Sequence, residues 1–240
     1  MGERLHAAFT QGPVPQASPG VILLIVAAVA VLSLPGKSWR YLGLLTTVVH
    51  ELGHAFGALM TGQRLRSIVL RADHSGTTTS LSRKRWPAVW SGFWGYPTPA
   101  VAGAALVTAG FTGWGSAAIA AATAVVLASL LFVRNFLGAA IVVATSAAGT
   151  AVVLLAPTAA TGYVAIVVGF MLLVGSVRAM GNLINVHIRR RGSLGSSDAY
   201  LLQRATGVPA VVWLLLFAGA IAASWYAASL PAAAVLFPGA

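Results

Sequence analysis

Two histidines and a glutamate in the stretch TTVVHELGHAFGALM, Thr46 to Met60, form the pattern HExxH. On a helix, His50 and His54 are four residues apart and lie on one face, where both imidazoles can reach a single tetrahedral zinc ion. Glu51 lies one step around the helix, where its carboxylate can take a proton from the attacking water. The spacing therefore predicts a zinc site with His50 and His54 as ligands and Glu51 as general base.

A catalytic zinc site also needs a third protein ligand and an open position for water. The chain has no cysteine, so the third ligand must be a histidine or a carboxylate. The candidates outside the motif are His6, His74, His187, Asp73 and Asp198. Of these, we expect His74 to be a polar turn residue rather than a ligand.

Asp198 lies in the polar stretch GSLGSSDAYLLQRATGVPA, which precedes the last apolar run. Ser196 or Ser197 can cap a short helix there, and Gly207 and Pro209 would end it. The helix dipole favours a carboxylate at such an N-terminus. Asp198 is therefore either a plain helix-terminal acid or the missing ligand.

The elements that must position these residues are apolar helices. Of 240 residues, 58% are hydrophobic and only 8% are charged, which indicates an integral membrane protein. We predict an all-α polytopic membrane protein of about seven transmembrane helices, with a short β-hairpin-like segment after the second span. The predicted spans are 19–34, 39–60, 96–111, 114–133, 136–156, 162–181 and 208–230. An ionised residue inside such a helix costs roughly 2.5 to 3.5 kcal/mol, so Glu51 within the second span indicates a function.

The basic residues set the expected orientation. Most of them fall in segments 62–86 and 178–207, which the positive-inside rule places in the cytoplasm together with the N-terminus. The formal net charge of +11 is spread between apolar runs, so anionic lipid headgroups are the expected partner and nucleic acid is not. The two histidines of the motif would then lie about 9 and 15 Å from the cytoplasmic end of their span, inside the membrane. Asp198 would also lie at the cytoplasmic side of the membrane.

We expect one integral membrane domain over 1–240. It comprises a polar tail at 1–18, a cytoplasmic hairpin-like loop at 62–86 and a cytoplasmic loop with a short helix at 182–207. Segments 65–72 and 77–81 are rich in β-branched residues and flank the turn sequence DHSG, which favours a hairpin. Such a hairpin could pair its edge with an unwound substrate segment, or its arginines could fasten it to lipid.

HELGH in an early span, the hairpin-like segment, the stretch GYPTPA and a late aspartate together resemble the site-2 protease family of intramembrane zinc metalloproteases. The similarity is closest to the small bacterial, single-domain branch. It implies that His50, His54 and Asp198 bind zinc, that Glu51 is the base, and that a membrane protein substrate is cleaved in or near a transmembrane segment. It also implies a bacterial plasma membrane location. In better-known members a glycine follows the late aspartate, whereas this chain has Ala199.

Asn182 and Asn185 are candidates for binding the oxyanion or substrate, at a wider spacing from Asp198 than in the family. Either asparagine could instead satisfy backbone groups at a helix end. Two other functions stay open. One is a catalytically silent scaffold of the same fold that binds a client membrane protein; the intact motif argues against it, and the altered surroundings of Asp198 argue for it. The other is a cation transporter, against which the nearly polar-free remaining spans argue. No motif specifies the substrate or the oligomeric state.

Overall fold

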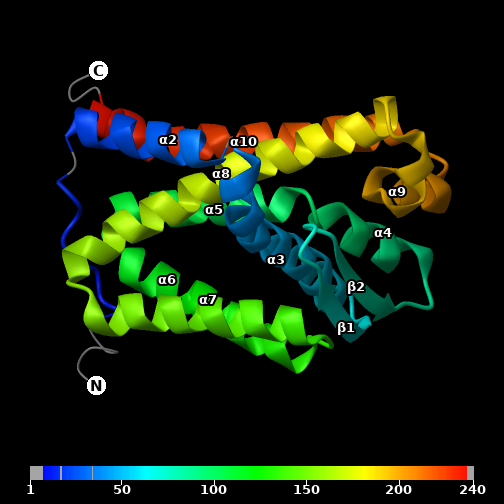
Figure 1. The fold of residues 1–240 in the computed structure, drawn as a ribbon, viewed down its shortest axis with the longest axis horizontal. Coiled ribbons are helices and arrows are strands. Elements are labelled where there is room, and N and C mark those ends of the chain that lie inside the picture. The colour runs from blue at the N-terminus through cyan, green and yellow to red at the C-terminus, as the bar shows by residue number, and fades with distance from the viewer. Residues whose placement is uncertain (1–7, 17, 34, 237–240) are drawn as a thin grey trace.

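The computed structural model describes residues 8–16, 18–33 and 35–236. It is mostly helical, with one two-stranded sheet (Figure 1). The helices are α2 (Pro19–Ser33), α3 (Gly36–Met60), α4 (Arg85–Trp94), α5 (Pro97–Phe111), α6 (Gly115–Ala128), α7 (Phe136–Leu155), α8 (Thr158–Ile188), α9 (Asp198–Thr206) and α10 (Ala210–Leu236). The strands are β1 (Arg64–Leu70) and β2 (Gly76–Leu81), and 3₁₀ turns lie at Ser129–Leu131 and Arg191–Ser196.

Each predicted span coincides with an apolar helix, but not every helix is long enough to cross a bilayer. Within the described residues, α7, α8 and α10 are long and apolar enough, and α2 with α3 would add a fourth if this pair, bent by 105°, is one span. Helices α5 and α6 have 15 and 14 residues, or about 22 Å of length against a hydrocarbon core of about 30 Å. Seven crossings are therefore not confirmed, and the orientation of the chain also stays a prediction.

Two elements expected in the polar segments are present, and the cytoplasmic location of these segments stays a prediction. Strands β1 and β2 form the expected antiparallel hairpin, and α9 is the expected short helix, with Ser197 at its N-cap and Gly207 in the left-handed conformation at its end. The predicted loop over 182–207 needs a correction, because α8 continues to Ile188 and only the residues after it leave the helix. The predicted tail, 1–18, lies partly outside the described residues.

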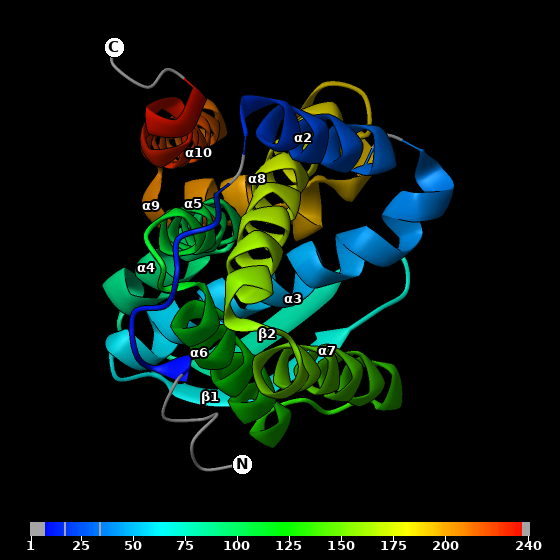
Figure 2. The ribbon, with the colours of Figure 1, turned by 90° about the vertical axis from the view of Figure 1, so that its left-hand side faces the viewer.

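The core of the molecule is built on the packing of α5 against α8, with α10 on one side and α6 on the other (Figures 1 and 2). Glycines allow α5 and α8 to approach each other closely. A Cβ atom at Gly103 would lie 2.6 Å from the carbonyl oxygen of Gly169, and a Cβ atom at Gly169 would lie 2.6 Å from the carbonyl oxygen of Gly103. Lipid tails are as apolar as these helices, so the hydrophobic effect does not drive their association in a membrane. Small residues let the backbones come close enough for van der Waals packing instead.

The hairpin packs against α3 and lies with α4 and α9 at one end of the molecule (Figure 1). Its outer edge, β1, is closed by the segment after α6, since Ile68 exchanges backbone hydrogen bonds with Phe132 and Arg134. Asn135 extends this contact, because its side-chain amide donates to the carbonyl of Leu70 at 2.7 Å and accepts from the N–H of Leu70 at 3.2 Å. Among the described residues, β2 is therefore paired on one side only.

Candidate metal centre

Helix α3 presents the two histidines of the motif on one face, as expected from their spacing, and α4 orients one of them. Nδ1 of His54 lies 2.8 Å from the carbonyl oxygen of Ser91. A carbonyl can only accept, so Nδ1 carries a proton, and Nε2 is the ring nitrogen that faces Asp198 and that a metal would take. The hydroxyl of Ser91 donates in return to the carbonyl of His54 at 2.8 Å. This pair of bonds ties α4 to α3 at the site.

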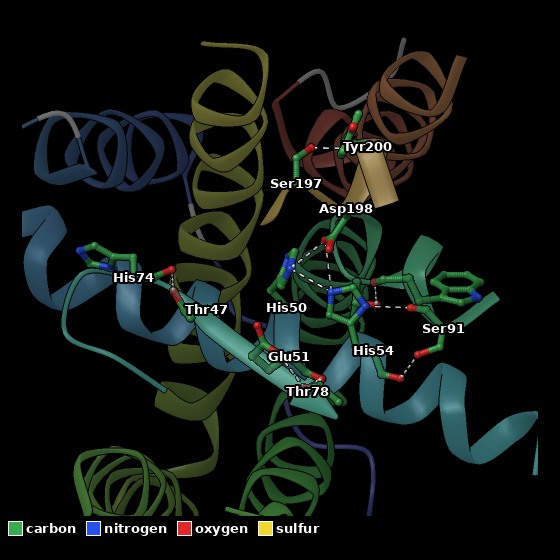
Figure 3. Close-up of polar contacts among 12 residues, drawn as sticks. Thr47, His50, Glu51, His54, His74, Thr78, Ser91, Ser197, Asp198 and Tyr200 are labelled. Atoms are coloured by element: carbon green, nitrogen blue, oxygen red, sulfur yellow. Dashed lines mark hydrogen bonds and ion pairs between the residues drawn. The ribbon is translucent and has the colours of Figure 1, made fainter. Parts of the chain in front are cut away.

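Asp198 reaches the histidines from the other end of the chain (Figure 3). Its Oδ2 lies 3.3 Å from Nε2 of His50 and 3.2 Å from Nε2 of His54. As the first residue of α9, Asp198 follows Ser197, whose hydroxyl lies 2.8 Å from Nε2 of His187 on α8 and accepts from the N–H of Tyr200. The end of α8 therefore anchors the turn that places Asp198.

The charge state of Asp198 is set by two opposing effects. Burial alone would raise the pKa of this carboxyl group. The charge of His54 and the hydrogen bonds from His50 and His54 outweigh burial and hold the pKa of Asp198 well below its usual range. The group is therefore a carboxylate that faces two imidazoles, which is the state in which it can bind a cation.

The three side chains fit a divalent metal. His50, His54 and Asp198 each offer one ligand atom, and the three atoms lie within 4.8 Å of one another. The two Nε2 atoms are 3.1 Å apart. Tetrahedral ligands at zinc bond lengths of about 2.0 to 2.1 Å stand about 3.3 Å apart, close to these separations. A set of two nitrogens and one carboxylate oxygen is also a usual one for catalytic zinc.

Glu51 turns from the imidazoles toward the hairpin, and only 3% of it is exposed (Figure 3). The hydroxyl of Thr78 on β2 lies 2.6 Å from Oε2 of Glu51 and 3.1 Å from its backbone oxygen. A Cβ atom at position 76 would collide with the carboxylate of Glu51, so the start of β2 can approach this closely only because residue 76 is glycine. Strand β2 therefore forms one wall of the site and holds the acid of the motif.

A cavity of about 810 Å³ connects these groups. It is lined by α3, the hairpin, α4, α9 and the end of α8, and includes His50, Glu51, His54 and Asp198. Asn182 contributes to this lining and Asn185 does not, so of the two asparagines only Asn182 faces the space where a substrate would bind. The oxyanion role of Asn182 stays a prediction.

The other ligand candidates lie elsewhere. Asp73 accepts hydrogen bonds from the backbone and hydroxyl of Ser75, which lower the pKa of its carboxyl group. His74, at the hairpin tip, has a positive φ of 65° and packs its ring beside Trp39. Neither belongs to the metal cluster within the described residues.

His187 contacts Ser197 and so supports the cluster without joining it. His6 lies outside the described residues.

A family model described as peptidase M50B-like matches residues 22–228, a range that holds both the histidine pair and Asp198. The chain belongs to this family. Peptidase M50B-like proteins are a site-2 protease family of membrane-embedded metalloproteases, and the M50 peptidases are zinc-dependent. The resemblance seen in the sequence is thereby confirmed at the level of the family. Neither the curated proteins nor the solved structures contain a match to the chain.

Four contacts at the site have no signature in the sequence of this M50B-like chain. Thr78 and Ser91 are ordinary residues of a strand and a helix, and only the folded structure brings them to Glu51 and His54. Tyr96 places its ring edge-on to that of His50, with centroids 4.8 Å apart. The glycine before it, Gly95, lies in the stretch GYPTPA, so the resemblance pointed to the segment but not to the contact.

Replacing Gly95 with alanine is expected to weaken metal binding about tenfold, as loss of a group supporting a ligand commonly does. A Cβ atom at Gly95 would collide with the imidazole of His54 and lie 2.9 Å from that of His50. The backbone of Gly95 is right-handed helical, so alanine adds no backbone strain. Zinc titration against a competing chelator measures the effect.

The matched control is Gly92→Ala, where the added atom would meet only the flexible side chain of Leu202. Equal zinc affinity in Gly95→Ala and Gly92→Ala would contradict the proposed role of the imidazole pair.

Proposed function

We propose that this M50B-like chain is an intramembrane zinc metalloprotease that hydrolyses a peptide bond in or near a transmembrane segment of a membrane protein. The observation that carries the proposal is the convergence of His50, His54 and Asp198, with Glu51 on the same helix as the histidines. Better-known family members have a glycine after the late aspartate, where this chain has Ala199. The alanine does not displace Asp198, since Ala199 is buried and Asp198 contacts both imidazoles. The catalytically silent scaffold stays the alternative, and the metal-removal experiment below separates the two.

Each residue then has a defined task. His50, His54 and Asp198 would hold zinc, which when bound supplies a Lewis acid that polarises the scissile carbonyl. Glu51 accepts a proton from the attacking water and passes it to the leaving amine. The hydroxyl of Thr78 donates to Oε2 of Glu51 and so positions the carboxylate for this task.

The substrate must reach this site in an extended form. A carbonyl within a helix is already hydrogen-bonded and shielded, so the scissile segment has to unwind first. One side of β2 is paired with no described residue, and β2 lines the cavity, so its backbone would offer donors and acceptors to such a segment. We therefore expect preferred substrates to carry helix-weakening residues near the cleavage position.

Metal removal tests the proposal directly. Purified protein is reconstituted with a single-span reporter that has Gly and Pro residues in the middle of its helix. Cleavage is expected to stop after treatment with a zinc chelator and to return when zinc is added, because a hydrolase of this type depends on the ion. Gel analysis and mass spectrometry of the products measure the effect. Zinc-loaded protein that cleaves no membrane reporter would instead favour the silent scaffold.

Replacing Thr78 with valine is expected to lower kcat about tenfold and to leave zinc content unchanged. Valine preserves the shape but removes a hydrogen bond to a charged acceptor, worth about 1.5 to 3 kcal/mol. Thr78→Ser restores the hydroxyl and should recover most of the rate. A pH–rate profile for the three proteins separates positioning of Glu51 from a general loss of stability. Wild-type kcat and an unchanged profile in Thr78→Val would refute the role of this hydroxyl.

A further inference from the structure

A second cavity lies at the base of the hairpin and contains no residue of the metal cluster. It measures about 720 Å³ and is formed where α3 ends, β1 begins, β2 ends and α4 begins. Three cations line it from both ends of the hairpin: Arg64 at the start of β1, and Arg83 and Lys84 just before α4. The proposed protease function does not involve this space.

Among the residues that the structure describes, no carboxylate forms an ion pair with these three cations. The whole chain has four acids. Glu51 and Asp198 belong to the metal centre, Asp73 is bound to Ser75 at the hairpin tip, and Glu3 lies outside the described residues. Within the part of the chain that the structure describes, no ion pair involves any of the three cations. Clustered like charges repel one another, so an anion from outside the chain would stabilise this arrangement.

The same cavity offers hydrogen-bond donors suited to a phosphate. The N-terminus of α4 follows Lys84, and no side chain caps it. Free N–H groups at a helix N-terminus favour an anion. Arg64 and Arg83 add guanidinium groups, which bind phosphate oxygens in pairs. These groups together match a phosphate rather than a single carboxylate.

The surroundings indicate a membrane source for that phosphate. Trp86, in the first turn of α4, is 65% exposed, and its ring lies 6.2 Å from that of Trp90. Exposed tryptophans beside basic residues are typical of the level where lipid headgroups lie. We infer that the cavity formed by Arg64, Arg83 and Lys84 binds the phosphate of an anionic lipid headgroup.

This site shares a wall with the metal centre. Gln63 and Ser82 line both cavities. The side chain of Gln63 is buried, accepts from Ser80 on β2 at 2.9 Å and donates to the carbonyl of Pro87 on α4 at 2.8 Å. A headgroup in the basic cavity would therefore lie against the bridge between β2 and α4, the two elements that hold Glu51 and His54.

Native mass spectrometry of the full chain in neutral detergent tests the inference. The probes are short-chain phosphatidylglycerol, phosphatidylcholine of the same acyl length, and inorganic phosphate. The variant is Arg64→Gln/Arg83→Gln/Lys84→Gln. Its matched control, Arg189→Gln/Arg190→Gln/Arg204→Gln, removes the same charge from exposed positions outside the cavity.

Wild type and control are expected to bind phosphatidylglycerol in preference to phosphatidylcholine, and the cavity variant to bind it at least about tenfold more weakly. An equal loss in both triple variants, or no loss in either, would overturn the site. Displacement of the lipid by inorganic phosphate with the same residue dependence would overturn the lipid as its source.

Folding is checked separately, so that a damaged variant does not decide the result. Elution volume and melting temperature should match wild type in both triple variants. If the cavity variant does not fold, Arg83→Gln and Arg83→Lys replace it. The glutamine should weaken phosphatidylglycerol binding and the lysine should retain most of it, and equal affinities would again refute the site.

Discussion

Replacing Glu51 with glutamine is expected to lower the rate of peptide-bond cleavage by about 10² to 10⁴-fold, the usual contribution of a general acid–base group. Glutamine has nearly the same shape and can still accept from Thr78 through its amide oxygen, but it cannot take a proton from water. Because Glu51 is not among the three ligand residues, zinc content should stay at the wild-type level. Reporter cleavage and metal analysis on the same preparations measure both effects.

The matched control for Glu51→Gln is Asp73→Asn, which removes one negative charge from the exposed hairpin tip. That variant should cleave at the wild-type rate. Full activity in Glu51→Gln would remove this residue from the role of base. Loss of zinc together with activity would mean instead that the carboxylate helps to hold the metal.

The second large effect is expected for Asp198→Ala, which should weaken zinc binding by more than about a hundredfold. Removal of a ligand costs more than loss of its supporting groups, which alone costs 10- to 100-fold. Only His50 and His54 would remain, 3.1 Å apart at Nε2. Metal analysis after dialysis against a weak chelator measures the loss, and it needs no knowledge of the substrate.

Two further variants are needed to interpret the zinc affinity of Asp198→Ala. His54→Ala should lose zinc to a similar extent, because it removes another member of the same cluster. Asp73→Ala, which deletes an acid outside the cluster, should keep wild-type stoichiometry and affinity. Wild-type zinc binding in Asp198→Ala would show that the carboxylate contacts the imidazoles without binding the metal.

The parts of the site that could be predicted are those governed by local rules. The spacing of His50 and His54 determines that they share a helix face, and the cap at Ser197 with Gly207 determines the short helix that begins at Asp198. The β-branched residues on either side of the turn sequence DHSG predicted the hairpin. The approach of Asp198 to the histidines rests on the packing of α8 and α9. The predicted topology placed Asp198 only on the same side of the membrane, and the family resemblance indicated the approach itself.

The number of membrane crossings could not be predicted from local rules. Hydropathy located each apolar helix, but 15 residues in α5 and 14 in α6 are short of the length that a crossing needs. The contacts of Thr78, Ser91 and Gly95 were also beyond local rules. Each joins residues that are distant in the chain, and composition carries no information on which backbone will lie beside which side chain.

The division of the ligand set between the first quarter and the last fifth of the chain has a consequence for biosynthesis. A nascent chain that has inserted α3 carries two imidazoles, but the carboxylate that completes the set emerges from the ribosome much later. Tight zinc loading would then follow assembly of α8 and α9, since ligands must converge before they bind a metal strongly. A copy in which α8 and α9 have not assembled would lack the carboxylate beside the imidazoles and would bind zinc weakly.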